Sequence, residues 1–189
     1  MNRKVLIVAH AMLLSLGGPA TAHRLDEYLQ ATVISLEADR VRAQMRLTPG
    51  VAVSSVVLGG IDTNSDGVIS ETEARAYGQR VLDDLSLSVD GHSLPLQLLS
   101  VNFPAVADMK AGLGEIQIEF RAHLPRGGAD RRLVFENHHQ SEIAAYLVNC
   151  LVPRDRNIRV VAQQRNEQQS FYQLDYTQAG NGIGPPSPQ

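Results

Sequence analysis

Residues 28–47 of the 189-residue chain read YLQATVISLEADRVRAQMRL. Apolar and polar residues alternate here in two short runs, which are separated by Asp39-Arg40. A period of two is typical of strands that bury one face. The stretch therefore predicts a β-hairpin with one apolar face, against which a second layer must pack.

Further strand patterns follow the hairpin. They are expected at residues 85–89, 94–98, 115–124, 132–136, 143–148, 158–163 and 170–176. Asp90-Gly91 separates the first two and is typical of a tight hairpin turn. About eight or nine short strands divided by turn residues predict a mainly β fold, an immunoglobulin-like antiparallel β-sandwich.

Two helical segments interrupt the strand pattern between residues 52 and 85. The first, residues 52–61, is rich in β-branched residues and contains Gly59-Gly60, so its helix propensity is weak. The second, residues 70–85, repeats apolar residues at helical spacing. We therefore expect a helix–loop–helix inserted into the β-domain at residues 52–85.

The two ends of the chain predict an exported protein. Arg3-Lys4 precedes an apolar run over residues 5–16, and Ala20-Thr21-Ala22 follows it. This order is that of a secretory signal peptide at residues 1–22, cleaved after Ala22, and the run is too short to span a bilayer. Residues 23–176 would form the β-domain of a periplasmic or secreted protein. Residues 177–189 are rich in Gly and Pro and predict a disordered tail.

Composition excludes several classes of function. With 17 basic and 20 acidic residues, the chain lacks the charge of a nucleic-acid-binding protein. The lone cysteine, Cys150, excludes an internal disulfide framework and a Cys-rich zinc site, and its apolar neighbours predict burial. No HExxH, GxSxG or phosphate-binding loop is present, so we expect no enzyme.

One segment carries a specific chemistry. Residues 62–73 read DTNSDGVISETE and resemble the twelve-residue calcium loop of the EF-hand family. Gly67 stands where that loop turns sharply. The resemblance implies Ca²⁺ held by side-chain oxygens, one carbonyl, a water-mediated contact and a bidentate carboxylate. Asp62, Asn64 and Asp66 would supply the side-chain oxygens, and Val68 would supply the carbonyl. Ser70 would make the water-mediated contact, and Glu73 would supply the bidentate carboxylate.

The same segment has a second interpretation, since Ser70-Glu71-Thr72-Glu73 is also a helix capping box. The two interpretations are compatible, but a cap alone does not explain Asp62, Asn64 and Asp66 together. EF-hands usually occur in pairs, and no second loop exists here, so Ile69 must pack on the host domain or on another copy. A single extracellular site predicts weak affinity, about 10⁻⁴ to 10⁻³ M, and a mainly structural role for the ion.

Histidines offer an alternative function. Cleavage after Ala22 would leave His23 at the N-terminus, where its amine and imidazole could chelate copper with a second histidine. The candidate partners are His92, His123, His138 and His139. This pattern would suit a periplasmic copper or nickel carrier that serves a membrane permease. Residues 136–139, which read ENHH, follow an apolar run at residues 133–135 and are more typical of a turn after a strand.

Longer motifs resemble the periplasmic module that precedes membrane domains of the HupE/UreJ (nickel-permease-like) type. They lie at residues 22–30, 47–51, 133–137, 146–149 and 152–153. No membrane helices follow them, and the chain ends in the Gly/Pro tail. Because the chain departs from the family pattern in this way, we expect either a stand-alone soluble version of the module or one that works beside a separately encoded membrane permease or another envelope protein.

Overall fold

The structure, a computed structural model, describes residues 26–179. The predicted signal peptide, its cleavage site and most of the predicted tail lie outside these residues. The strands are β1 (Tyr28–Leu36), β2 (Arg40–Pro49), β3 (Leu85–Val89), β4 (His92–Ser93), β5 (Gln97–Asn102), β6 (Ile116–His123), β7 (Asp130–Asn137), β8 (Ala144–Cys150), β9 (Ile158–Arg165) and β10 (Phe171–Gln178). The helices are α1 (Ser54–Ile61), α2 (Glu71–Asp83) and α3 (Val106–Lys110).

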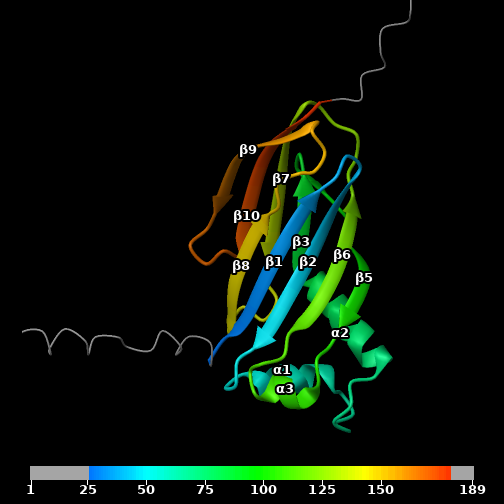
Figure 1. The fold of residues 1–189 in the computed structure, drawn as a ribbon, viewed down its shortest axis with the longest axis vertical. Helices are drawn as coiled ribbons and strands as arrows, with labels where there is room; N and C mark the ends of the chain where they lie inside the picture. Colours follow the sequence, from blue (N-terminus) through cyan, green and yellow to red (C-terminus); the bar gives the residue numbers. More distant parts are fainter. Residues whose placement is uncertain (1–25, 180–189) are drawn as a thin grey trace, which may run out of the picture.

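The strands form two five-stranded sheets packed together (Figure 1). The first sheet has the order β5-β6-β2-β1-β8, and the second has the order β4-β3-β7-β10-β9. The prediction of a mainly β, sandwich-like fold is thereby confirmed, and three short helices accompany the two sheets.

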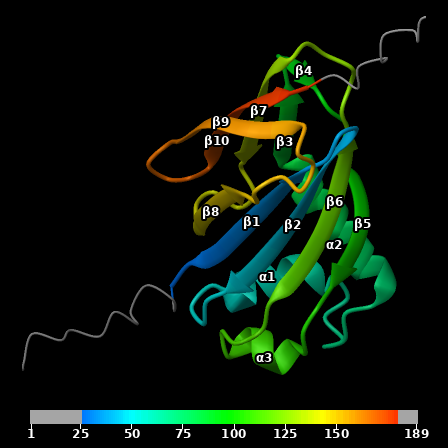
Figure 2. The same ribbon diagram turned by 45° about the horizontal axis from the view of Figure 1, so that its top comes forward.

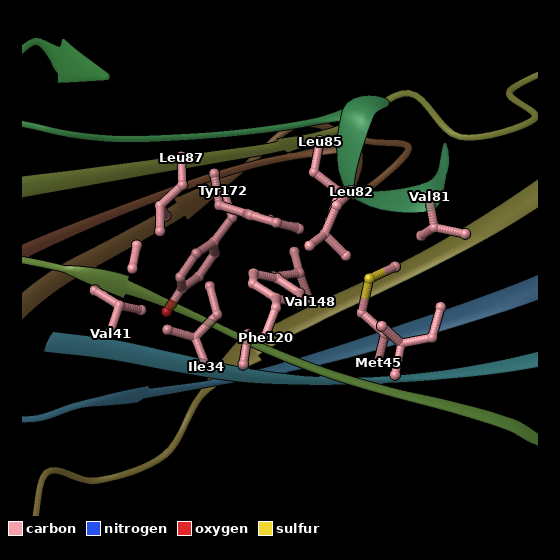
Figure 3. Packing of buried hydrophobic residues seen from close by; sticks show 14 of the residues in the cluster. Ile34, Val41, Met45, Val81, Leu82, Leu85, Leu87, Phe120, Val148 and Tyr172 are labelled. Carbon is pink, nitrogen blue, oxygen red and sulfur yellow. The ribbon is translucent and has the colours of Figure 1, made fainter. Parts of the chain in front are cut away.

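Residues 28–47 form the predicted hairpin. Strands β1 and β2 pair antiparallel from Tyr28↔Pro49 to Leu36↔Val41. Their inward side chains meet those of the second sheet, and Figure 3 shows Ile34 and Val41 facing Leu87 and Tyr172 across the core. Because every second side chain of the hairpin is buried, a one-residue slip would turn this face to water.

The expectation of a wholly antiparallel sandwich is wrong at one pair. Strands β1 and β8 run parallel, from Tyr28↔Ala144 to Ile34↔Cys150. The chain leaves β7 in the second sheet and enters β8 in the first, so β8 arrives beside β1 in the same direction. Alternation in the sequence specifies which face of a strand is buried, but not which neighbour the strand pairs with.

The prediction of a single strand at residues 94–98 is also wrong. Strand β4 ends at Ser93 and pairs with β3, while β5 begins at Gln97 and pairs with β6 in the other sheet. Pro95 lies between them and has no backbone N–H to donate to a ladder. The chain therefore crosses from one sheet to the other at this point.

Two smaller differences concern the end of β10 and the presence of α3. Strand β10 continues through Thr177 to Gln178, which pair with Arg159 and Ile158, so it enters the segment expected as a tail. The sequence patterns do not predict α3, because five residues are too few to show a helical period.

The helices gather at one end of the sandwich (Figure 2). Helix α2 packs on β5, where a Cβ added at Gly78 would lie 3.1 Å from Cδ2 of Leu98. The missing side chain thus permits the close approach. Val57, Ile61 and Val81 are fully buried and extend the core beneath the helices.

Within residues 26–179, no helix combines the length and the apolar character needed to cross a membrane.

Candidate functional site

The loop between α1 and α2 is held by its own polar side chains. Asp62 Oδ2 accepts the N–H of Gly67 at 2.9 Å, and Asp66 Oδ1 accepts the N–H of Val68 at 2.8 Å. Asp62 Oδ1 and Asn64 Oδ1 both accept the N–H of Asp66, at 3.1 and 3.0 Å. Gly67 has a φ of +80°, a conformation that glycine adopts without a Cβ clash. The side chains at loop positions 1, 3 and 5 therefore turn toward the loop backbone.

Glu73 connects the two ends of this loop. Its Oε1 accepts the N–H and the hydroxyl of Thr63 at 2.8 and 3.0 Å. Its Oε2 accepts the N–H and the hydroxyl of Ser70 at 3.1 and 2.7 Å. The Ser70 hydroxyl in turn accepts the N–H of Glu73, which completes the predicted capping box. These donors, those of Ser70 first, lower the pKa of Glu73 to about 2.

The predicted ligands are thus brought to one loop but not assembled around one point. Among residues 26–179, no three His, Cys, Asp or Glu side chains are grouped closely enough to hold a metal. Glu73 faces Thr63 and Ser70, and Val68 exposes 65% of its surface. The atoms predicted to coordinate the ion are all oxygens, which suits a hard cation such as Ca²⁺. The residues fit calcium in their chemistry and loop path, provided that the Glu73 carboxylate changes partners.

Ile69 packs on the host domain. It is partly buried against the core that the two sheets enclose. Of the two possibilities that the sequence leaves open for this residue, the structure shows the first. The loop is therefore attached to the sandwich through an apolar contact as well as through the two helices.

A buried polar chain joins α2 to the sandwich, and the sequence analysis missed it. The hydroxyl of Tyr28 on β1 lies 2.5 Å from that of Tyr77 on α2. The Tyr77 hydroxyl lies 3.1 Å from Nε2 of His139, whose Nδ1 lies 2.7 Å from Oδ2 of Asp84. Burial lowers the pKa of His139 and raises the pKa values of Tyr28 and Tyr77. This Tyr28–Tyr77–His139–Asp84 chain fixes the helix–loop–helix to the first sheet.

Neighbouring groups fix the backbone of His139. Gln30 Nε2 and the Tyr146 hydroxyl donate to its carbonyl at 2.8 and 3.1 Å. Asn137 accepts the His139 N–H and donates to Gln30 Oε1. The signal that could have revealed this network is Gln30, a polar residue at an inward position of β1 that is fully buried.

The other candidate metal ligands are dispersed. His138 is exposed and lies 3.4 Å from Glu136, while both ring nitrogens of His139 have partners. His92 and His123 line a cavity of about 560 Å³, and neither His138 nor His139 lines that cavity. His23 lies outside the described residues. The structure therefore brings together no pair of histidines with a third metal ligand within residues 26–179.

Cys150 is buried, as predicted. Burial raises the pKa of its thiol to about 11, so the thiolate needed for nucleophilic chemistry is scarce at neutral pH.

No protein-family model, curated protein or solved structure matches this chain.

Proposed function

We propose that the chain is an exported, non-enzymatic calcium-binding module. In this proposal an EF-hand helix–loop–helix is inserted into an immunoglobulin-like sandwich. The observation that carries it is that Asp62 Oδ1 and Asn64 Oδ1 share the N–H of Asp66. Two oxygens from loop positions 1 and 3 therefore already lie together, as a shell of six to eight oxygens requires.

The expected calcium ligands are those of the loop pattern: Asp62, Asn64, Asp66, Val68 through its carbonyl, Ser70 through water, and Glu73. To join them, the Glu73 carboxylate has to leave Thr63 and Ser70. That exchange forfeits hydrogen bonds to an ionised group and so reduces the net affinity. It supports a dissociation constant in the weak extracellular range, about 10⁻⁴ to 10⁻³ M.

The ion would serve mainly to stabilise the domain. The loop joins two helices whose buried faces complete one end of the core, through Val57 and Ile61 on α1 and Val81 on α2. An ion that binds only the folded loop stabilises the whole domain by mass action. Because the sequence has one cysteine, no internal disulfide can form, and calcium would supply the cross-link that many exported domains obtain from cysteines.

Thermal melting in calcium and in chelator tests this function. In about 10 mM calcium, a dissociation constant of about 10⁻⁴ M adds about 2.7 kcal/mol to the free energy of unfolding. For a domain of this size, that corresponds to a rise of about 5–10 °C in Tm. Glu73→Gln and Asp62→Ala should abolish the rise, whereas Glu71→Gln on the same first turn of α2 should retain it. Equal melting curves in calcium and chelator would refute the proposal.

The rival proposal is a copper or nickel carrier that uses His23 and serves a membrane permease. No observation within residues 26–179 favours it. Titration of the mature protein with copper and nickel separates the two, because metal binding that is lost in His23→Ala would support the carrier. A partnership with an envelope protein is compatible with either proposal.

A further inference from the structure

Strand β8 ends the first sheet with an unpaired edge. It pairs with β1, and no other described strand lies on its far side (Figure 2). An edge strand presents unpaired N–H and C=O groups to its surroundings and can pair with another extended chain. This edge therefore has the chemistry to bind a peptide backbone.

The pairing register shows which backbone groups are free. Tyr28 donates its N–H to the carbonyl of Ile143 at 2.7 Å, and Leu151 donates to the carbonyl of Ile34 at 2.8 Å. In a parallel ladder, alternate residues of one strand bond to the same neighbour. The odd-numbered residues of β8 thus bond to β1, and the N–H and C=O groups of Ala144 and Tyr146 point outward.

The other sheet edges differ from β8. Strand β5 has a register irregularity between Leu98 and Ser100, β4 has only two residues, and β9 carries Arg159 and Arg165. Strand β8 reads AAYLVNC, with neither a charge nor a proline. Arg165 Nε donates to the carbonyl of Val148 at 2.9 Å and covers the end of the edge, while the part before it is left open.

Two hollows follow this open part. One has a volume of about 380 Å³ and is lined by Ala144 and Tyr146, and the other, of about 610 Å³, is lined by Leu147 and Val148. Glu167 and Gln169, from the connection between β9 and β10, line both hollows. Both hollows therefore border the same connection, and we call them together the β8 groove.

The groove has two chemically distinct ends. The Ala144 end is lined by Glu27 and Glu167 and by no lysine or arginine. The other end is lined by Val33, Leu147 and the cationic Arg165, and Leu147 exposes 45% of its surface. A complementary ligand combines an extended backbone with aliphatic side chains at alternate positions and a cationic group near Glu27 and Glu167.

We propose that the β8 groove binds such an extended, basic and aliphatic peptide segment of a partner protein as a sixth strand of the first sheet. Main-chain hydrogen bonds to Ala144 and Tyr146 would supply the pairing, and the two hollows would select the side chains. The proposal does not depend on calcium, because no predicted calcium ligand lines the groove.

A random dodecapeptide library displayed on phage, selected against the mature chain, tests the proposal. Enriched peptides should alternate aliphatic residues and carry Lys or Arg near one end. Leu147→Lys and Glu167→Lys should each weaken binding of the synthetic peptide by about tenfold or more. The matched controls Leu99→Lys, on β5 of the same sheet, and Glu119→Lys, on β6, should leave its affinity unchanged.

Backbone pairing is tested separately by amide hydrogen exchange, which should slow at Ala144 and Tyr146 when the peptide binds. Repeated selections that enrich no peptide, or peptides that bind the Leu147→Lys protein as tightly, would overturn the proposal. Self-association that Leu147→Lys abolishes would also overturn it, because a second copy would then be the occupant. Equal affinities in calcium and chelator are expected, so failure here and failure of the calcium proposal remain distinguishable.

Discussion

The hydroxyl of Tyr77 lies 3.1 Å from Nε2 of His139, and this contact joins α2 to the sandwich. Asp84, the residue that caps the C-terminus of α2, lies 2.7 Å from the other ring nitrogen through its Oδ2. The carboxylate favours an Nδ1–H donor, so neutral His139 accepts from Tyr77 and Tyr28 donates to Tyr77. The buried hydroxyls of Tyr28 and Tyr77 and both ring nitrogens of His139 then have partners.

Removing the Tyr77 hydroxyl should destabilise the domain. Tyr77→Phe leaves the buried Tyr28 hydroxyl and His139 Nε2 without their partner, and a loss of about 1–3 kcal/mol in the free energy of unfolding is expected. Tyr172→Phe is the matched control, because the Tyr172 hydroxyl donates to Oε1 of the exposed Gln163, which can accept from water instead. Urea unfolding measures both, and an equal loss in the two variants would contradict the role given to Tyr77.

Stability should fall as His139 becomes protonated. Protonation makes Nε2 a donor, so Tyr77 must accept from it and donate to Tyr28, whose own O–H then loses its partner. Burial lowers the pKa of His139 from 6.5 despite the opposing effect of Asp84, and Arg80 also lowers it. The unfolded chain therefore binds the proton more readily than the folded chain. The stabilisation that neutral His139 gives the folded state is present above pH about 6.5 and is lost as the pH falls below that value.

Urea unfolding between pH 8 and pH 5 measures this dependence. His139→Gln should flatten the stability profile between these values, whereas His138→Gln, which changes an exposed ring, should retain the wild-type slope. Glu73 contributes in a separate window, since its lowered pKa affects stability only as the pH falls from 4.5 toward about 2. A wild-type slope in His139→Gln would refute the assignment.

Gly114 should not tolerate a side chain. An added Cβ would lie 2.6 Å from Cγ of Pro104 and 3.0 Å from the backbone nitrogen of Met109. Gly114→Ala should therefore cost about 1–3 kcal/mol through overpacking. At Gly128 an added Cβ meets nothing within 4 Å, so Gly128→Ala is the control and should be near neutral. Thermal melting of the two variants checks the difference.

Cys150 should resist alkylation in the folded protein. Burial raises the pKa of its thiol to about 11, and Sγ donates to the carbonyl of Leu151 at 3.3 Å. Iodoacetamide at pH 8 should modify the native chain far more slowly than the chain in urea. Equal rates in both conditions would show that the thiol is accessible.

The sequence predicts the parts of this fold that follow from local periodicity. The alternation in residues 28–47 predicts the β1–β2 hairpin, and Ser70 and Glu73 predict the start of α2. It does not predict the parallel pairing of β8 with β1, because choice of neighbour depends on the path between sheets. The Tyr77–His139 contact spans 62 positions and joins residues with no local pattern in common.

The sequence likewise predicts some features of the candidate site and leaves others undecided. The loop spacing selects Asp62, Asn64 and Asp66 as one group, and in the structure their oxygens accept N–H groups of one backbone segment. The spacing does not decide between a Glu73 that caps α2 and one that joins the other loop oxygens. That choice depends on whether the free energy of binding an ion offsets the loss of the Glu73 hydrogen bonds to Thr63 and Ser70.

Calorimetric titration of calcium into the metal-free mature protein tests the central claim most directly. The account predicts one site per chain with a dissociation constant of about 10⁻⁴ to 10⁻³ M. Glu73→Gln should abolish the binding heat, and Glu71→Gln should leave it unchanged. Absence of binding heat at millimolar calcium in the wild-type protein, or unaltered binding in Glu73→Gln, would contradict the account.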